Sequence, residues 1–276
     1  MDNRADEVAA LANAAMYDST TVNKYIDMAP HIRHPSLRNL YAELVVKVFD
    51  GACENCDVPR ILDLGAGEGS ATLPLLKLGA RVTAVDISQS MIDALVAKCA
   101  DHKERLETHC QDVLEAIESF KDDSCCFDIV IASSFLHHIP DYLELIERAC
   151  TIISPRGQFL SFQDPLRYDS LGRFTMAFTR FAHDSWRLLQ GDVIGGIKRR
   201  MRRSRGVFLD IPEDNTEYHF LRGGVDQDAI MELFKELGFD CDIICYFSTD
   251  GAAWQHLGNF FGMENNFAVV ARKRSY

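Results

Sequence analysis

The chain has 276 residues, a formal net charge of −12, 47% hydrophobic residues and 25% charged residues. This composition is typical of a folded globular protein and excludes collagen-like, low-complexity and disordered chains. The apolar run around Ile129–Ile131 is far shorter than the roughly 20 residues that a membrane span needs. The polar, acidic start of the chain does not resemble a signal or transit peptide. We therefore expect a cytoplasmic protein that does not use a membrane.

The nine cysteines are odd in number and are not accompanied by an export signal, which favours reduced thiols. Cys53 and Cys56 form a C-x-x-C pair. No second pair of cysteines or histidines stands at a spacing suited to zinc. The sequence therefore predicts no metal site.

Residues 1–55 predict an N-terminal helical cap. Pro30 and Pro35 interrupt it, and an apolar stripe at helical spacing runs through Pro35–Phe49.

From Arg60 onward, short apolar runs alternate with helical segments. The expected strands are Arg60–Leu64, Arg81–Asp86, Leu106–Cys110, Phe127–Ala132 and Gln158–Phe162. The expected helices are roughly Ser70–Leu78, Gln89–Ala100, Val113–Phe120 and Asp141–Ile153. Ser88 is expected to cap one helix, and Gly79 to end another. Alternation of this kind predicts an α/β domain with a mostly parallel sheet.

After Asp164 the alternation stops for about sixty residues, a length that is unusual for a bare connection. Four aromatic residues stand at helical spacings there, and we expect them to form a local core: Phe174, Phe178, Phe181 and Trp186. We therefore predict an inserted helical lid or substrate subdomain over 165–225. The α/β domain would comprise 56–164 and 226–276.

The final segment predicts a helix over Asp226–Leu237, capped by Asp226, and two strands over Asp240–Phe247 and Asn266–Arg272. The glycine-containing stretch between these strands is predicted to be a loop.

A basic run, Lys198–Arg205, stands out from an otherwise acidic chain. It is consistent with a solvated face, or with a docking site for an anionic substrate group or an acidic carrier protein. Contact with nucleic acid is disfavoured because the rest of the chain is strongly negative.

The strongest motif joins the first expected strand to the first expected helix. It reads Gly65-Ala66-Gly67-Glu68-Gly69 and directly follows Asp63-Leu64. Glycines let a backbone turn sharply and approach a ligand closely. Such a loop alone suits several nucleotide ligands.

Polar residues follow three further strands. Asp86 ends the second strand and suits a ribose diol, while Asp112 follows the third and can accept a hydrogen bond from an adenine amine. Ser133-Ser134 and then His137-His138 follow the fourth strand. Ligands of open α/β sheets bind outside the carboxyl ends of the strands, so these segments are expected to converge there.

This ordered set of motifs over residues 60–165 resembles the class I S-adenosylmethionine (SAM)-dependent methyltransferases. The resemblance implies a Rossmann-like sheet of seven strands with the last antiparallel, and SAM as cofactor. It places Gly65 and Gly67 against the methionine part of SAM and Asp86 on the ribose. Ile87, Met91 and Asp112 would lie at the adenine, and Asp63 would order the loop and the amino group. The full candidate set for the cofactor is Tyr25, Asp63, Gly65, Ala66, Gly67, Asp86, Ile87, Met91, Gln111, Asp112, Val113, Ser133 and Ser134.

A nicotinamide-binding Rossmann domain is the nearest alternative. It accounts for Gly65, Gly67 and Asp86, but it does not require Asp112 and favours glycine where Ser70 stands.

Methyl transfer from a sulfonium needs alignment, and it needs a base only when the nucleophile must lose a proton. His137, His138 and Asp164 are the candidate catalytic residues. Adjacent side chains usually point different ways, so one histidine at most is expected to face the site. A role in shaping the loop is the alternative for each histidine.

The sequence thus predicts a methyltransferase acting on an oxygen or nitrogen of a small molecule. Two alternatives remain: an enzyme acting on protein or tRNA, and a protein that binds SAM without transferring its methyl group.

Overall fold

A computed structural model of the chain describes residues 29–122, 126–189 and 223–275; Tyr25 and the basic run Lys198–Arg205 lie outside them. The described residues form one seven-stranded sheet in the order β3-β2-β1-β4-β5-β7-β6. The strands are β1 Arg60–Leu64, β2 Arg81–Asp86, β3 Leu106–Cys110, β4 Phe127–Ser133, β5 Ile153–Pro165, β6 Phe239–Tyr246 and β7 Asn266–Lys273. Strands β1 to β5 pair in parallel, and β7 runs antiparallel to both β5 and β6. The predicted fold is confirmed.

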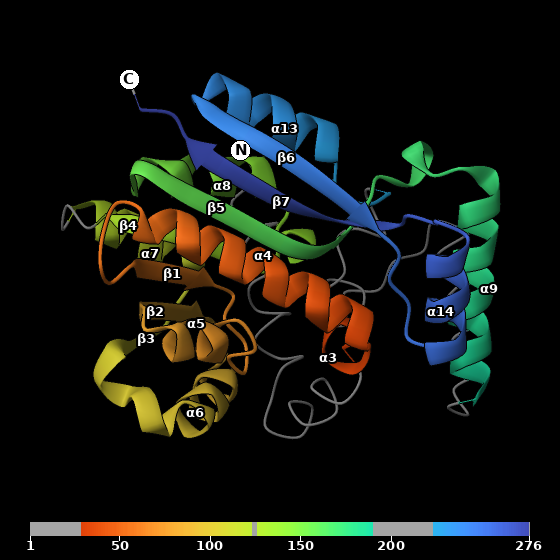
Figure 1. Cartoon of the computed structure of the whole chain (residues 1–276), viewed down its shortest axis with the longest axis horizontal. Helices are drawn as coiled ribbons and strands as arrows, with labels where there is room; N and C mark the ends of the chain where they lie inside the picture. The colour runs from red at the N-terminus through yellow and green to blue at the C-terminus, as the bar shows by residue number, and fades with distance from the viewer. Residues whose placement is uncertain (1–28, 123–125, 190–222, 276) are drawn as a thin grey trace.

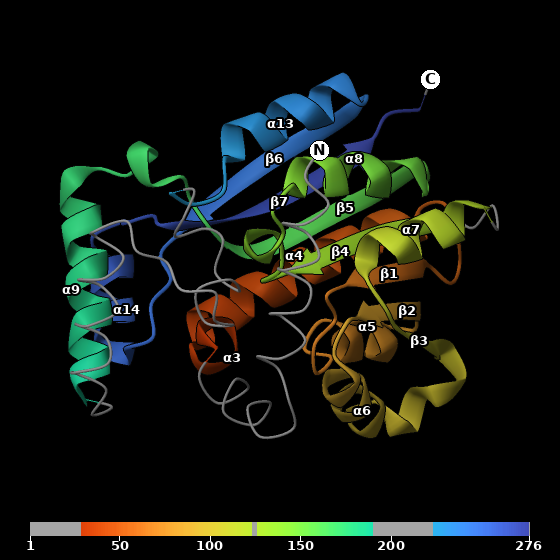
Figure 2. The same cartoon turned by 180° about the vertical axis from the view of Figure 1, so that it is seen from behind.

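Helices cover both faces of the sheet (Figures 1 and 2). One face carries α3 Pro30–Arg33, α4 Pro35–Cys53, α5 Thr72–Leu78 and α6 Gln89–Lys98; the other carries α7 Val113–Asp122, α8 Tyr142–Thr151 and α13 Gln227–Glu236. Short 3-10 turns span η1 Ala100–Arg105, η2 Leu136–His138 and η3 Tyr168–Ser170. Each face buries its own apolar cluster, as the alternation of side chains along the strands requires.

Local signals fix most helix ends as predicted. The Ser88 side chain caps α6, the Asp226 side chain caps α13, and Gly79 ends α5 at a φ of 107°. Among the described helices, none is both long enough and apolar enough to cross a membrane.

Strand β5 is longer than predicted, and α8 is correspondingly shorter. Helix α8 ends at Thr151, and β5 already begins at Ile153, continuing through Arg156, whose φ is +63°. The Pro155-Arg156-Gly157 segment therefore does not only stop a helix; it is an irregular start to the strand.

The stretch between β6 and β7 was expected to be a loop, and this prediction is wrong, because it forms α14, Ala252–Phe260. Gly258 is tolerated in the helix because a Cβ there would overlap the ring of Phe247. The Gln255 side chain also binds the backbone of Phe247 and Thr249.

Helix α9, Arg173–Leu189, lies beside α14 at one end of the molecule (Figures 1 and 2). Its aromatic residues do not form the local core that we expected. Phe178 and Phe181 pack edge-on against Trp254 of α14, and Phe174 is 71% exposed. Trp186 instead lies under the guanidinium of Arg33, next to α4. The described part of 165–225 therefore covers α14 and α3; the predicted division into domains stays a prediction.

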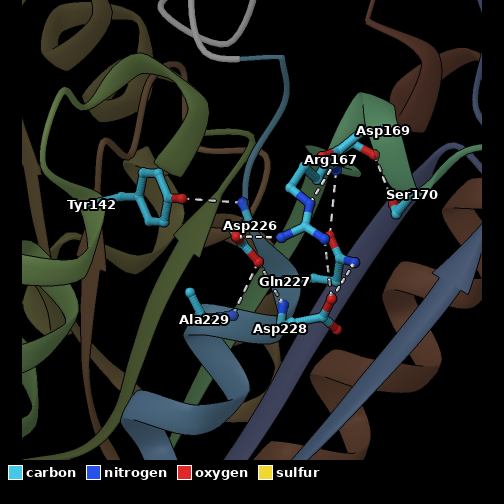
Figure 3. Close-up of polar contacts among 8 residues, drawn as sticks. All are labelled: Tyr142, Arg167, Asp169, Ser170, Asp226, Gln227, Asp228 and Ala229. Atoms are coloured by element: carbon cyan, nitrogen blue, oxygen red, sulfur yellow. Dashed lines mark hydrogen bonds and ion pairs between the residues drawn. The ribbon is translucent and has the colours of Figure 1, made fainter.

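The chain leaving β5 and the chain leading into α13 are held side by side (Figure 3). Leu166 and Val225 form a parallel bridge, and a Cβ on Gly224 would overlap the backbone of Leu166. The Arg167 guanidinium binds Asp226 at 2.7 Å and Asp169 at 2.6 Å. The Tyr142 hydroxyl accepts a hydrogen bond from the backbone N–H of Asp226. These contacts join the two ends of the predicted insertion.

Candidate active site

The glycine loop joins β1 to α5 and needs its glycines for two different reasons. Gly65 and Gly67 both have positive φ, at +66° and +53°, a region that costs other residues strain. A Cβ on Gly65 would overlap the Phe135 ring, whereas nothing lies within 4 Å of a Cβ on Gly67. Gly65 is thus required by packing, while Gly67 leaves its backbone accessible on one side.

Asp63, near the end of β1, is a buried carboxylate with one satisfied oxygen. It is 1% exposed, and its Oδ2 accepts a hydrogen bond of 2.6 Å from the Thr72 hydroxyl. Its Oδ1 is buried and has no hydrogen-bond partner. Burial, with the nearby carboxylates of Asp86 and Glu68, raises the pKa of Asp63 to about 7 against the Thr72 hydrogen bond.

Asp86 ties the glycine loop to the start of α6. Its two carboxylate oxygens accept hydrogen bonds of 2.8 Å, one from the N–H of Gly67 and one from the N–H of Ser88. Burial raises the pKa of Asp86, and the backbone donors oppose that rise. Met91 lies one turn into α6 and is buried. The structure therefore places Asp86, Ile87 and Met91 beside the glycine loop, as the resemblance implies.

The residues after β3 occupy the neighbouring strand end. The N–H of Gln111 donates to the carbonyl of Asp86 at 3.2 Å. The Asp112 carboxylate accepts from the N–H of Leu114 at 2.8 Å and so caps α7, which begins at buried Val113. Capping explains this aspartate without any ligand, and its role toward adenine stays a prediction.

The backbone after β4 bends sharply toward the glycine loop. Ser134 has a φ of +54°, and its N–H donates to the carbonyl of Phe162 at 2.6 Å. Such strain in a non-glycine residue is often found at functional sites. It brings Phe135 against Gly65 and leaves Ser133 on the same face of the sheet as Asp63.

His137 and Asp164 form a buried pair at the end of this segment. The Oδ1 of Asp164 lies 2.8 Å from His137 Nδ1 and accepts the His137 backbone N–H at 3.1 Å. Burial lowers the pKa of His137 to about 4 and raises that of Asp164 to about 8. Each shift disfavours a charge in an apolar setting, so the pair holds one shared proton at neutral pH.

Two details of this pair differ from the sequence prediction. Asp164 lies inside β5, paired with Phe267, and not past its end, because the strand continues beyond a bulge at Gln163. His138 is also buried, and its ring lies 4.1 Å from that of His137. The two adjacent histidines thus pack together.

Comparison with known proteins follows this geometry closely. Residues 62–161, which run from β1 into β5, match the family described as "Methyltransferase domain". This segment is a class I methyltransferase domain. It covers little more than a third of the chain.

Curated relatives align with the methyltransferase domain only. A ubiquinone biosynthesis O-methyltransferase of Coxiella burnetii is 35% identical over 99 residues, which are 36% of this chain and 41% of that protein. The enzyme of the same name from Methylocella silvestris is 34% identical over 98 residues, 36% of this chain and 37% of that protein. The match thus spans about two fifths of the length of these relatives.

Solved structures share the fold over nearly the whole chain. Magnesium protoporphyrin IX methyltransferase from Synechocystis PCC 6803 with bound SAH has a TM-score of 0.57 at 14% identity, covering 96% of this chain and 99% of that one. The (4+2)-cyclase SpnF has a TM-score of 0.55 at 15% identity, covering 95% of both chains. At these identities the likeness shows the fold alone.

Sequence reasoning missed two side chains that lie over the methyltransferase domain. His31 of α3 and Tyr41 of α4 are both buried on the sheet face that carries Asp63. Tyr41 was assigned only to the apolar stripe of its helix. Its hydroxyl was the available signal, because a polar atom in a fully buried stripe needs a partner.

Proposed function

We propose that this chain is a SAM-dependent methyltransferase that methylates an oxygen or nitrogen atom of a small molecule. The observation that supports this most is the buried Asp63 carboxylate, whose Oδ1 has no partner beside the glycine loop. It lies next to the switch point between β1 and β4, where open α/β sheets bind their ligands.

The chemistry of the surrounding groups fits SAM. Asp63, Asp86 and Glu68 place three carboxylates near one ammonium, that of Lys98, which binds Glu68 at 2.7 Å. An excess of buried negative charge favours a cationic ligand. Asp63 would hold the amino group of SAM, and Asp86, which retains acceptor capacity beyond its two backbone donors, would hold the ribose.

SAM supplies a methyl group already attached to a good leaving group, and the chain must align, shield and, for some acceptors, deprotonate. The accessible backbone of Gly67 allows close approach of the cofactor. His137 and Asp164 would accept the proton that a hydroxyl acceptor loses as the new bond forms. Asp164 would also orient the His137 ring through Nδ1.

An oxygen acceptor is favoured by this buried pair, because an amine can attack in its neutral form without a positioned base. The relatives named as O-methyltransferases agree with that choice over the shared domain. An anionic group on the acceptor, or an acidic carrier, docking at Lys198–Arg205 is a further part of the proposal, and it rests on the sequence alone.

A second candidate is a protein that binds SAM without transferring its methyl group. It is favoured by the likeness to a cyclase, since one fold can host several reactions.

Calorimetric titration of the full chain with S-adenosylhomocysteine (SAH), with NAD as control, tests the cofactor. We expect micromolar binding of SAH and no binding of NAD; binding of NAD alone would overturn the proposal. Incubation with methyl-labelled SAM and a metabolite extract then tests transfer. Label in small molecules supports the proposal, label in protein or RNA indicates a macromolecular acceptor, and no label favours the second candidate.

A further inference from the structure

A group of buried polar atoms without partners lies between the N-terminal helices and the glycine loop. It comprises His31 Nδ1, Tyr41 Oη, Asp63 Oδ1 and Glu68 Oε1, which we call the buried polar cluster. Each of these residues is at most 7% exposed. Four of the seven such atoms among the described residues belong to it. Buried polar groups are normally hydrogen-bonded, so this concentration requires an explanation.

The contacts of these residues show that they face one another. The rings of His31 and Tyr41 lie 6.4 Å apart, and both pack against Phe162 at the end of β5. The carboxylates of Asp63 and Glu68 act on the Tyr41 hydroxyl and, together with its burial, raise its pKa, while Ser133 opposes them. Lys98, which binds Glu68, acts in turn on His31 and, after burial, lowers its pKa to about 4.

A neighbouring histidine shows what a satisfied side chain looks like in the same region. His34 is 4% exposed, and its Nε2 lies 2.7 Å from the carbonyl oxygen of Thr249. It therefore has a structural partner within the fold. His31, three residues earlier and equally buried, has none at Nδ1.

The cluster offers both kinds of hydrogen-bonding group. The carboxylates of Asp63 and Glu68 accept hydrogen bonds, and the Tyr41 hydroxyl and a neutral His31 ring can donate them. An α-amino acid group carries an ammonium that donates and a carboxylate that accepts. The two sets are complementary.

We propose that Tyr41 and His31 bind the carboxylate of the amino-acid end of SAM, so that helices α3 and α4 complete a site whose ammonium partner is Asp63. This inference rests on the proposed function. In this role Tyr41 and His31 are specificity residues for the amino-acid end and do not touch the nucleoside.

The test compares two probes that differ in that end. SAH carries the amino acid, and 5′-methylthioadenosine lacks it. Calorimetry with the full chain gives the dissociation constant of each probe for the wild type, Tyr41→Phe and His31→Leu. We expect Tyr41→Phe to weaken SAH binding by about 10- to 100-fold, the range for a lost hydrogen bond to a charged group, and to leave methylthioadenosine unchanged.

Thermal unfolding without ligand gives a second readout with the opposite sign. Tyr41→Phe keeps the ring packed on Phe162 and removes an unpaired buried hydroxyl, so the midpoint should stay the same or rise. A lower midpoint would show that the hydroxyl has a structural partner, and would overturn the proposal. Equal weakening of both probes, or of neither, would overturn it as well.

His34→Leu is the matched control, because it removes a buried histidine from the same turn of the chain. It should lower the unfolding midpoint and leave the ratio of the two dissociation constants unchanged. A change in this ratio equal to that of His31→Leu would overturn the assignment of His31. If the wild type binds neither probe, the proposed function fails first.

Discussion

Asp164 accepts two hydrogen bonds from His137 on the same oxygen, one from the backbone N–H and one from the ring. The backbone bond fixes where the histidine sits, and the ring bond fixes how the imidazole is turned. A side chain held at two points in this way is pre-organised, which is what proton transfer in a buried site requires.

The pH dependence of turnover tests this pair. With the pKa of His137 near 4 and that of Asp164 near 8, one proton stays on the pair between these values. It leaves only as the pH rises through about 8, so kcat/KM should rise with pH and level off above that value. A flat profile from pH 6 to 9 with full activity would remove the base from the mechanism.

Asp164→Asn should abolish this rising limb. The amide cannot take up the proton, and kcat should fall by about 10²- to 10⁴-fold, the usual contribution of a positioned base. Binding of SAH should be unaffected, as calorimetry can show. A parallel loss of SAH binding would instead assign Asp164 to the architecture of the cofactor site.

Asp63 predicts a pH dependence of binding itself. Its pKa is about 7 without ligand, and an adjacent ammonium would lower it, so binding should release a proton. SAH affinity should therefore weaken by up to about tenfold per pH unit below pH 7. Titrations in two buffers with different ionisation heats measure this proton. Asp63→Asn should remove the release, and an unchanged release would assign it to Glu68 or Asp86.

Gly65 and Gly67 should respond differently to alanine. Gly65→Ala adds backbone strain and an overlap with Phe135, and should cost about 2–4 kcal/mol of unfolding free energy. Gly67→Ala meets open space and should cost only the strain, about 1–2 kcal/mol. Gly67→Ala should nevertheless weaken SAH binding. Denaturant unfolding and calorimetry on both variants separate the two effects, and equal behaviour would contradict the distinction.

Asp86→Ala should weaken SAH and methylthioadenosine equally, by about 10- to 100-fold, because both ligands carry the ribose. The variant should also lose stability, since the N–H groups of Gly67 and Ser88 lose their acceptor. Loss of SAH binding alone would place Asp86 at the amino-acid end, contrary to the ribose assignment.

Arg167→Met should lower the unfolding midpoint without changing SAH affinity, because Arg167 joins two distant chain segments well away from the glycine loop (Figure 3). Arg148→Met is the matched control. Arg148 is similarly exposed and pairs with Glu144 and Glu118 on neighbouring helices. A larger effect from the control would argue against a special role for the Arg167 contacts.

The strand ends of the site could be predicted from the sequence because they depend on local patterns. Asp63, Asp86 and Asp112 each stand where an apolar run stops, and parallel strands bring their carboxyl ends to one edge. The roles of these residues toward a ligand stay predictions.

Features that depend on distant contacts could not be predicted. The bulge that turns Asp164 toward His137 is held by the Tyr246 hydroxyl, which accepts the Gln163 N–H from a strand 83 residues away. Helix α14 was missed because Gly258 suggests a break until the Phe247 ring is seen to fill its side. Tyr41 was taken for an ordinary core residue until α4 was seen to lie over Asp63.

The antiparallel strand β7 has a consequence for biosynthesis. It lies between β5 and β6, so β5 keeps an open edge until the chain has been made as far as Lys273. A fragment ending at Pro165 would contain every motif of the methyltransferase domain, yet would present an apolar strand edge that invites self-association. The motif-bearing segment therefore depends, for a monomeric folded state, on a C-terminal tail that carries none of those motifs.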